Sequence, residues 1–273
     1  MVQILKADGT FEDFKKSKIE KTVLKAGGSK ELAKEVSSKV AKKIKKGIST
    51  KEILKLTLKS LKKNPCVAKR YNLKRAIMLL GPHGFTFEEF FSQLLQNYGY
   101  KTRVGQILKG KATTHEVDII AKNKKKYMIE CKYHNRAGKH SNSKVAMYTY
   151  ARFLDLHNYK KNKINQGWLA TNTKCTPHAI EYAKGVGLKI TSWKYASDNE
   201  KNLQELIEFR KLYPITILSS VIGHIKEKLA RAKIVLAKDI ITYNIHELKE
   251  KTGLKEKELR KILREANSIC IDE

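Results

Sequence analysis

The chain has 273 residues, of which 41% are hydrophobic, so it can bury the cores of two domains or of three small ones. No apolar run approaches the roughly 18 residues that cross a bilayer, and residues 1–9 carry no apolar signal segment. We therefore expect a cytoplasmic protein without a membrane partner. The net charge of +30 attracts polyanions, nucleic acid first, although the lysine enrichment of some thermophiles or an AT-rich genome would also raise it.

The basic excess lies in the first two thirds of the chain. Residues 1–80 contain 22 Lys and Arg against 7 Asp and Glu, residues 81–200 contain 20 against 9, and residues 201–273 contain 15 against 11. The four cysteines lack the close spacing of a zinc site or a redox pair, which indicates free thiols in a reducing compartment.

Residues 1–82 are predicted to form a small, mostly helical domain that begins with a hairpin. Asp8-Gly9 is a strong turn signal between the short extended runs of residues 2–14. Ser17 is placed to cap a first helix that ends at Gly27-Gly28. Further helices are expected over residues 30–46, from Ser49 or Thr50 to about 62, and over about 67–80.

Residues 83–197 alternate between helical and strand patterns. Helices are expected over residues 87–98, 144–156 and 177–184. Strands are expected over residues 100–108, 115–121, 127–133, 166–171 and 188–193. This order predicts a mixed sheet covered by helices, so the central domain belongs to the α/β class.

Residues 198–273 are predicted to be a small all-α module. The spacing of apolar residues favours one helix over 202–212 and a longer one over 215–237. The run IHELKEKTGLKEKELRKIL (245–263) then reads as a helix, a turn at Thr252-Gly253 and a second helix.

Two neighbouring strands, over 115–121 and 127–133, carry charged residues where a buried sheet is usually apolar. In the first strand, alternation puts Asp118 on one face and Val117 and Ile119 on the other. The second strand has charged residues at alternate positions too, so both strands present one polar face.

The polar residues of the second strand are Glu130 and Lys132. If the link between the strands turns about Lys124, paired positions sum to 248, and Asp118 then faces Glu130. The same register sets Glu116 opposite Lys132.

Two carboxylates directly opposite each other repel, and a divalent cation between them is one reason to keep them. Mg²⁺ prefers hard oxygen ligands and often uses only one or two carboxylates together with phosphate and water. Lys132 beside them could neutralise a phosphate oxygen or hold an attacking water. A surface hairpin with a solvated polar face explains the spacing equally well.

A family resemblance bears on this choice. Asp118, eleven further residues and then Glu130-Cys131-Lys132 resemble the motif of the PD-(D/E)XK nuclease superfamily. FEEFFSQLLQNYGY (87–100) resembles the first helix of Mrr-type restriction endonucleases, and TNTKCTPHAIEYAKGVGLKITSW (171–193) resembles their closing helix and strand. The resemblance implies catalysis by Asp118, Glu130 and Lys132, with Asp118 and Glu130 as ligands of Mg²⁺ or Mn²⁺ and with Glu88 as the auxiliary acid of the first helix.

The chain departs from the Mrr pattern at two places. Mrr-type enzymes often have Gln at the position of Glu130. The Gly-rich pair that usually precedes the strand aspartate is replaced by His115-Glu116-Val117, which leaves the number of metal ions open. Glu88 is also explained as an exposed acid that the helix dipole favours.

The segment ILKADGTFEDFKKSKIEKTVLKAG (4–27), with GIST (47–50) further on, resembles the ATP-cone, a nucleotide-binding regulatory domain of ribonucleotide reductases and their repressor. Lysines near a helix N-terminus suit phosphates. The resemblance implies that ATP or dATP is bound by Ile4 at the base, by Lys6 and Lys18 at the phosphates, and by Glu12, Lys15 and Thr50. Ala7 stands where a basic residue is common, and a lysine-rich helical DNA-binding domain is the alternative.

The segment TGLKEKELRKIL (252–263) resembles the helix-turn-helix of transcription regulators and also helix-hairpin-helix modules. A plain dimerisation pair of helices fits the same pattern. The small basic excess of this module does not favour DNA binding.

The sequence thus predicts three domains: an ATP-cone over 1–82, a PD-(D/E)XK nuclease over 83–197 and a helical module over 198–273. The predicted activity is Mg²⁺-dependent endonucleolytic cleavage of DNA in restriction-type defence, regulated by ATP or dATP. A homodimer with two sites would suit double-strand cleavage. The alternatives are a structure-specific repair or recombination nuclease and a non-catalytic, nucleotide-sensing DNA-binding regulator.

Overall fold

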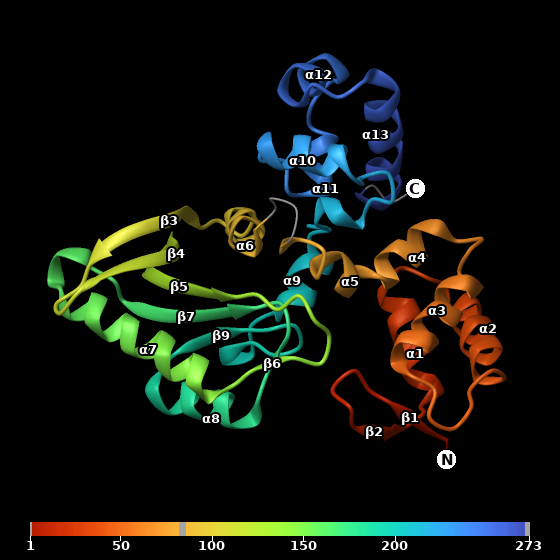
Figure 1. Ribbon diagram of the computed structural model, residues 1–273, viewed down its shortest axis with the longest axis horizontal. Coiled ribbons are helices and arrows are strands. Elements are labelled where there is room, and N and C mark those ends of the chain that lie inside the picture. Colours follow the sequence, from red (N-terminus) through yellow and green to blue (C-terminus); the bar gives the residue numbers. More distant parts are fainter. Residues whose placement is uncertain (1, 82–85, 271–273) are drawn as a thin grey trace.

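A tight turn starts the N-terminal part of the fold. Gly9, with φ of +85°, closes the hairpin of β1 (Gln3–Leu5) and β2 (Phe11–Asp13), in which Gln3 pairs with Asp13. The predicted hairpin is confirmed. The computed structural model describes residues 2–81 and 86–270, and Figure 1 shows the hairpin below the helices of the N-terminal part.

The helices of the N-terminal part are α1 (Lys16–Lys25), α2 (Lys30–Ala41), α3 (Thr50–Ser60), α4 (Pro65–Tyr71) and α5 (Leu73–Ile77). The apolar faces of α1 to α4 pack with Ile4 of the hairpin into one core that contains Val23, Val36 and Leu61, while α5 packs into the core of the central sheet. Ser49, one of the two residues predicted to start this helix, caps α3 in a capping box with Glu52.

Helix boundaries in this part differ from the prediction at three points. Ser17 lies inside α1, because the extended Lys15 is the N-cap residue and makes no side-chain capping bond. Helix α2 ends at Ala41, since residues 42–46 are four lysines around one isoleucine and have no apolar face to bury. The last predicted helix is divided at Asn72 into α4 and α5.

A five-stranded mixed sheet forms the centre of the molecule. Its strands, in spatial order, are β3 (Lys101–Lys109), β4 (Thr114–Lys122), β5 (Lys126–Lys132), β7 (Gln166–Thr171) and β9 (Lys189–Thr191). The first three are antiparallel, and β5, β7 and β9 are parallel. The predicted mixed α/β fold is confirmed.

Helices cover both faces of this sheet (Figure 1). On one face, α6 (Phe87–Gln96) packs Phe91 against Trp168 of β7. On the other face lie α7 (Ser143–Asn158) and α8 (Pro177–Val186), which bury Ala146 and Ala179 against Leu169. A small parallel pair, β6 (His140–Ser141) and β8 (Lys174–Cys175), was not predicted, because two-residue strands have no periodicity.

The C-terminal helices are α9 (Leu203–Phe209), α10 (His224–Arg231), α11 (Ala237–Ile240), α12 (Ile245–Thr252) and α13 (Glu256–Cys270). The helix predicted over 215–237 is wrong. A 3-10 turn over 215–217 and α10 replace it, and the left-handed residues Gly223 (φ 49°) and Lys233 (φ 57°) stand before and after α10. The predicted helix, turn and helix at the end are confirmed, with Gly253 between α12 and α13.

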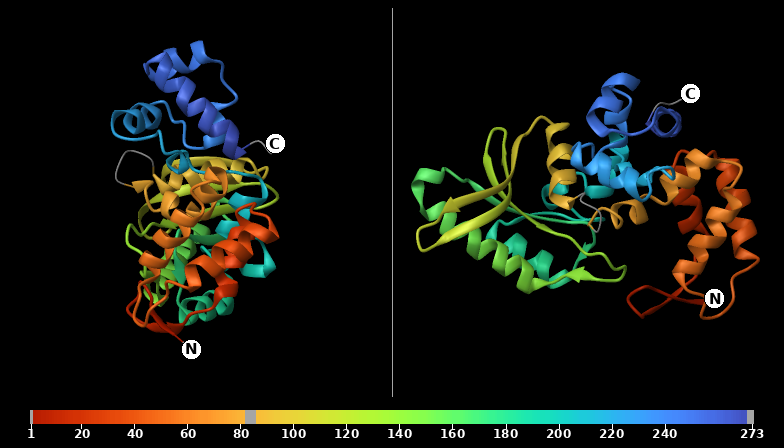
Figure 2. Two further views of the ribbon diagram at one scale, coloured as in Figure 1. Left: turned by 90° about the vertical axis from the view of Figure 1, so that its right-hand side faces the viewer. Right: turned by 45° about the horizontal axis from the view of Figure 1, so that its top comes forward.

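The C-terminal helices and the central sheet share one core. The same buried cluster contains Phe91 of α6, Trp168 of β7, Ile207 of α9 and Ile262 of α13. Figure 2 shows these helices above the junction between the sheet and the N-terminal helices. Within residues 2–81 and 86–270, no helix is long and apolar enough to cross a membrane.

A buried carboxylate joins the N-terminal helices to the C-terminal ones. Glu265 of α13 lies 2.6 Å from Lys69 Nζ of α4, and it accepts hydrogen bonds from the backbone of Ser219 and Ser220. Burial alone would raise the pKa of Glu265, but Lys69, the Ser220 hydroxyl and the two backbone amides lower it to about 2.

We expect Glu265→Gln to lower the free energy of unfolding by about 3 kcal/mol at pH 7, from the difference between pKa 4.5 and about 2. Because the folded-state pKa is depressed, this stabilisation is present above pH 4.5 and is lost as the pH falls towards 2. Denaturant unfolding of wild type and variant should therefore converge in acid. Glu250→Gln, at an exposed position of α12, is the control. Equal stability of both variants at pH 7 contradicts the assignment.

Candidate active site

The strand β4 is irregular at Asp118. Its pairing with β3 continues on either side but omits Asp118 and the opposite Gly105, which has φ of +61°. Val117 packs in one cluster with Ile120, while Ile119 packs in the cluster on the other face of the sheet. The prediction that Val117 and Ile119 share a face is therefore wrong, because strict alternation fails where the strand is distorted.

The strand β5 supplies the other two residues of the motif. The ladder between β4 and β5 pairs Ile119 with Ile129, so the predicted sum of 248 is confirmed for this pair and for those nearer the turn. The regular ladder stops there, one position short of Asp118 and Glu130. Instead, the Asp118 Oδ2 atom accepts a hydrogen bond of 2.6 Å from the backbone amide of Cys131.

Glu130 lies in an environment that opposes its ionisation. Burial and the nearby Asp118 raise the pKa of Glu130 to about 7, although Arg152 and Lys132 act in the opposite direction. Burial also raises the pKa of Asp118, and the Cys131 amide and Arg152 offset part of this effect. A buried carboxylate whose pKa is raised by a neighbouring carboxylate forms a site that favours added positive charge.

Glu88 lies at the start of α6 and belongs to the same electrostatic environment. Burial raises the pKa of Glu88, and the next contribution comes from Asp118. Helix α6 begins here because Thr86 caps it through a hydrogen bond from the amide of Glu89. The structure thus places Glu88 close enough to this site that Asp118 raises its pKa and that Glu88 in turn raises the pKa of Glu130.

Arg152 of α7 is a site residue that sequence reasoning missed. Its guanidinium donates to Glu130 Oε2, and both side chains are largely buried, at 11% and 15% exposure. The signal was available: Arg152 lies three residues after Thr149 and four before Leu156, both on the buried side of α7. A charged residue on that side of a helix needs a charged partner.

Glu116 does not take the place expected for it. It pairs with Ile107 of β3, and the ladder between β4 and β5 does not extend to it. Lys132, its expected partner, is the exposed last residue of β5.

The donor set at this site fits a divalent cation held through few protein ligands. No group of three or more metal-binding side chains occurs in the part of the chain that the structure describes. Asp118 and Glu130 offer only hard carboxylate oxygens, which suit Mg²⁺ or Mn²⁺ completed by water and phosphate. The repulsion between these carboxylates is the observation that a cation would relieve.

The N-terminal hairpin gathers most residues of the expected nucleotide site. It docks on the segment before α3, where Gly47 N donates to Gln3 O and Leu5 N donates to Ile48 O. This docking brings Ile4 and Lys6 towards Thr50 at the start of α3. Glu12 pairs with Ile4 across the hairpin and forms an ion pair with Lys18.

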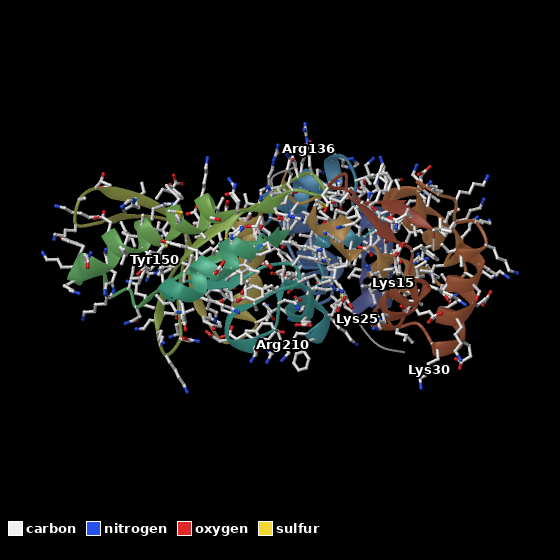
Figure 3. The ribbon with its side chains drawn as sticks, turned by 90° about the horizontal axis from the view of Figure 1, so that it is seen from below. Lys15, Lys25, Lys30, Arg136, Tyr150 and Arg210 are labelled. Carbon is white, nitrogen blue, oxygen red and sulfur yellow. The ribbon has the colours of Figure 1, made fainter. Side chains whose placement is uncertain are left out.

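The remaining phosphate-site candidates are basic and accessible. Lys6 forms an ion pair of 3.4 Å with Asp8 at the tip of the hairpin. Lys15 is exposed at the start of α1, and Figure 3 labels it among the basic side chains of the N-terminal helices. The geometry therefore collects three lysines beside a hairpin and two helix N-termini, an arrangement that suits a polyphosphate.

Comparison with known proteins agrees with both resemblances found in the sequence. Family models match the chain as an ATP cone domain over residues 2–77, as a restriction endonuclease over 81–197 and as AF1548-like, C-terminal, over 213–270. An uncharacterized protein of Archaeoglobus fulgidus is 37% identical over 179 residues, which cover 65% of this chain and 98% of that protein.

A solved structure is also similar. The crystal structure of the protein of unknown function AF1548 matches with a TM-score of 0.59 and 36% identity, covering 67% of this chain and 96% of that one. The resemblance to an ATP-cone and to an Mrr-type restriction endonuclease is thereby confirmed. The chain belongs to the AF1548-like family, with an ATP cone domain at its N-terminus and a restriction endonuclease domain at its centre.

Proposed function

We propose that the protein is a metal-dependent endonuclease that hydrolyses phosphodiester bonds of DNA in restriction-type defence, and that its ATP cone regulates cleavage. The observations that support this most are the hydrogen bond from the amide of Cys131, which lies between Glu130 and Lys132, to Asp118 and the contact of the Arg152 guanidinium with Glu130. An intact and charged constellation favours an enzyme over a non-catalytic regulator.

Each side chain then has a definite role. Asp118 and Glu130 would hold Mg²⁺ or Mn²⁺, which would supply charge stabilisation and an acidified water. The Cys131 amide fixes Asp118, because the hydrogen bond to Oδ2 leaves the other carboxylate oxygen for a ligand. Lys132, exposed at the end of β5, would contact the phosphate or the attacking water.

Arg152 and Glu88 act on the same centre from the two covering helices. Arg152 holds the Glu130 carboxylate in place and would add positive charge near a bound phosphate. Glu88 adds negative charge near Asp118 and would serve as the auxiliary acid.

The regulatory part of the proposal rests on contacts between the N-terminal part and the segment after the catalytic strand. A Cβ on Gly138 would lie 2.6 Å from the Ala7 carbonyl carbon and 2.8 Å from Asp8 N, so only glycine lets the hairpin tip approach this closely. The Tyr133 hydroxyl, next to Lys132, donates to Met78 O over 2.6 Å.

Residues 133–138 are therefore held at both ends by the N-terminal part. A nucleotide bound at Ile4, Lys6, Glu12, Lys15, Lys18 and Thr50 would order the hairpin, and the hairpin tip contacts the segment that continues from Lys132. Figure 3 shows Arg136 of this segment pointing outward at the edge of the molecule. A shift of the tip has a direct structural route to the catalytic strand.

Replacement of Asp118, Glu130 or Lys132 by Ala should each lower the rate of DNA cleavage in Mg²⁺ by at least about 100-fold while DNA binding persists. The carboxylate variants lose the metal, and the lysine variant loses a positioned charge. Single-turnover cleavage of a labelled duplex measures the rate. Glu181→Ala, an exposed carboxylate on α8, should cut like wild type. Wild-type cleavage by Glu130→Ala would falsify the site assignment.

Arg152→Ala should lower the cleavage rate by about 10-fold or more, because Glu130 loses the group that orients it, and Arg152→Lys should recover part of this loss. Both variants are compared in single-turnover cleavage and in duplex binding. A change in duplex affinity with an unchanged cleavage rate argues against the orienting role.

ATP or dATP should bind the purified chain, and the double substitution of Lys6 and Lys18 by Ala should remove binding in calorimetry because the phosphates lose two cations. Substitution of Lys34 and Lys59, exposed lysines of α2 and α3, is the charge-matched control. Absence of nucleotide binding by the wild type would leave the basic DNA-binding interpretation of residues 1–82.

Gly138→Ala should abolish the effect of ATP on the cleavage rate and leave ATP binding intact, because the added Cβ displaces the hairpin tip. Gly185→Ala is the matched control, since a Cβ at that position of α8 meets nothing within 4 Å. The two variants are assayed for cleavage with and without ATP. An unchanged ATP effect in Gly138→Ala rules out coupling through this contact.

A further inference from the structure

A basic groove lies beside the turn between β4 and β5, apart from the residues assigned above. Its volume is about 810 Å³, and it is lined by fourteen residues. Eight of these are cationic: Lys101 and Arg103 of β3, four lysines within 122–126, and Lys161 and Lys163 beyond α7. None of the fourteen is acidic.

Three of the lysines form a row across neighbouring strands. Lys101 pairs with Lys122, and Lys122 pairs with Lys126. Residues directly opposite each other point to the same face with Cβ atoms about 5 Å apart, and like charges at such positions are destabilising. A row of three lysines therefore has a cost that an anion in the groove would remove.

The environment of Lys126 shows that these charges converge on one space. Its ammonium donates to Asn162 O over 2.7 Å, and its backbone amide donates to Asn165 Oδ1. Burial lowers the pKa of Lys126, and Lys122, Arg103 and Lys163 lower it further. Cations from three separate segments thus repel one another across the groove.

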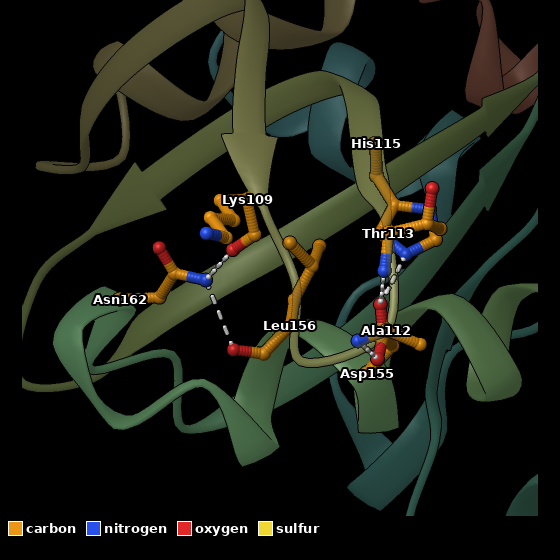
Figure 4. A network of polar contacts seen from close by, with 7 residues as sticks. All are labelled: Lys109, Ala112, Thr113, His115, Asp155, Leu156 and Asn162. Carbon is orange, nitrogen blue, oxygen red and sulfur yellow. Dashed lines mark hydrogen bonds and ion pairs between the residues drawn. The ribbon is translucent and has the colours of Figure 1, made fainter.

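Polar contacts fix the wall of the groove (Figure 4). Asn162 Nδ2 donates to Lys109 O and to Leu156 O, which joins the end of β3 to the end of α7. Asp155 accepts from the amides of residues 112 and 113 and contacts His115, so it is occupied by the turn between β3 and β4. Hydrogen bonds to β3 and to α7 therefore hold in place the backbone that carries the cations.

The composition of the groove selects the chemistry of its ligand. None of the fourteen lining residues is aromatic, so the groove offers no platform for stacking an unpaired base. Lysines together with Thr102, Gln106, Asn162 and Asn165 are typical contacts to backbone phosphates. The groove suits a run of phosphates whose bases are already paired.

The groove lies within reach of a duplex bound at the candidate active site. Lys122 is four residues from Asp118 along β4, and Lys126 is four residues from Glu130 along β5, a separation of about 13 Å. Alternation along β5 puts Lys126 on the same face as Glu130. This distance corresponds to about four base-pair steps along the axis of a duplex.

We propose that this groove binds the sugar-phosphate backbone of duplex DNA about four nucleotides from the cleaved bond. The proposal deepens the nuclease function above and rests on it. Backbone binding here would hold the duplex in register across the active site without reading its sequence.

The test compares two full-length variants with the same net charge. Lys101→Gln with Lys122→Gln removes two cations of the row, and Lys184→Gln with Lys249→Gln removes two exposed lysines of α8 and α12. Both pairs are made in an Asp118→Ala background without divalent cations, so that binding is measured without cleavage. Affinities for a 24-base-pair duplex are measured over a salt series, with ATP binding as a second readout.

The groove variant should bind the duplex about 10-fold more weakly, and the slope of log affinity against log salt should fall by about 2, because two phosphate contacts are lost. The control should keep the wild-type slope, and both should bind ATP like wild type. Equal affinity and slope in both variants overturn the groove proposal, and so does loss of ATP binding in the groove variant. If the wild type cuts DNA and the groove variant keeps the affinity and salt slope of the control, the groove proposal is refuted and the nuclease function is not.

Discussion

Repulsion between two carboxylates in the interior of the sheet is the constraint around which the central domain is arranged. Asp118 raises the pKa of Glu130, and each carboxylate has a fixed partner, the Cys131 amide for Asp118 and the Arg152 guanidinium for Glu130. Regular pairing stops beside them, since a continuous ladder would press the side chains together. The distortion at Asp118 and the inward charge on α7 are both consequences of keeping this pair.

The packing around the site makes it sensitive to distant parts of the chain. One core runs from α6 through the sheet to the C-terminal helices, so those helices support the covering helix that carries Glu88. The segment after Lys132 touches the N-terminal part at Met78 and at Ala7. Glu265 ties α13 to α4. The regulation proposed above would use these contacts, because packed interiors do not deform continuously.

The positions of the basic residues say more about where an anion would bind than the net charge does. Many lysines, such as Lys34 of α2 and Lys249 of α12, are exposed on helix surfaces, where their mutual repulsion is screened. The row formed by Lys101, Lys122 and Lys126 is different, because strand pairing holds the charges close together and Lys126 is partly buried. A site for phosphates differs from an ordinary solvated surface in how closely its charges are held together, and not in the total charge of the chain.

The sequence by itself determined the main elements of the central domain and the register of β4 and β5 near their turn, and it proposed Asp118, Glu130 and Lys132 as the candidate site. These depend on local periodicity and on a short link, which restrict pairing to one parity. The division of residues 215–237 into a 3-10 turn and α10 was not predictable in this way. These residues are apolar at helical spacing, and tertiary packing favours the shorter elements over one long helix.

Only the tertiary structure decided which distant groups meet. Arg152 reaches Glu130 from another element, Gly138 receives the tip of a hairpin from the other end of the chain, and Lys101 completes a row with two lysines of a different hairpin. Periodicity records which side of an element is buried, but it carries no information on what that side will face. That partner is set by the packing of whole elements, whose energy is spread over many contacts.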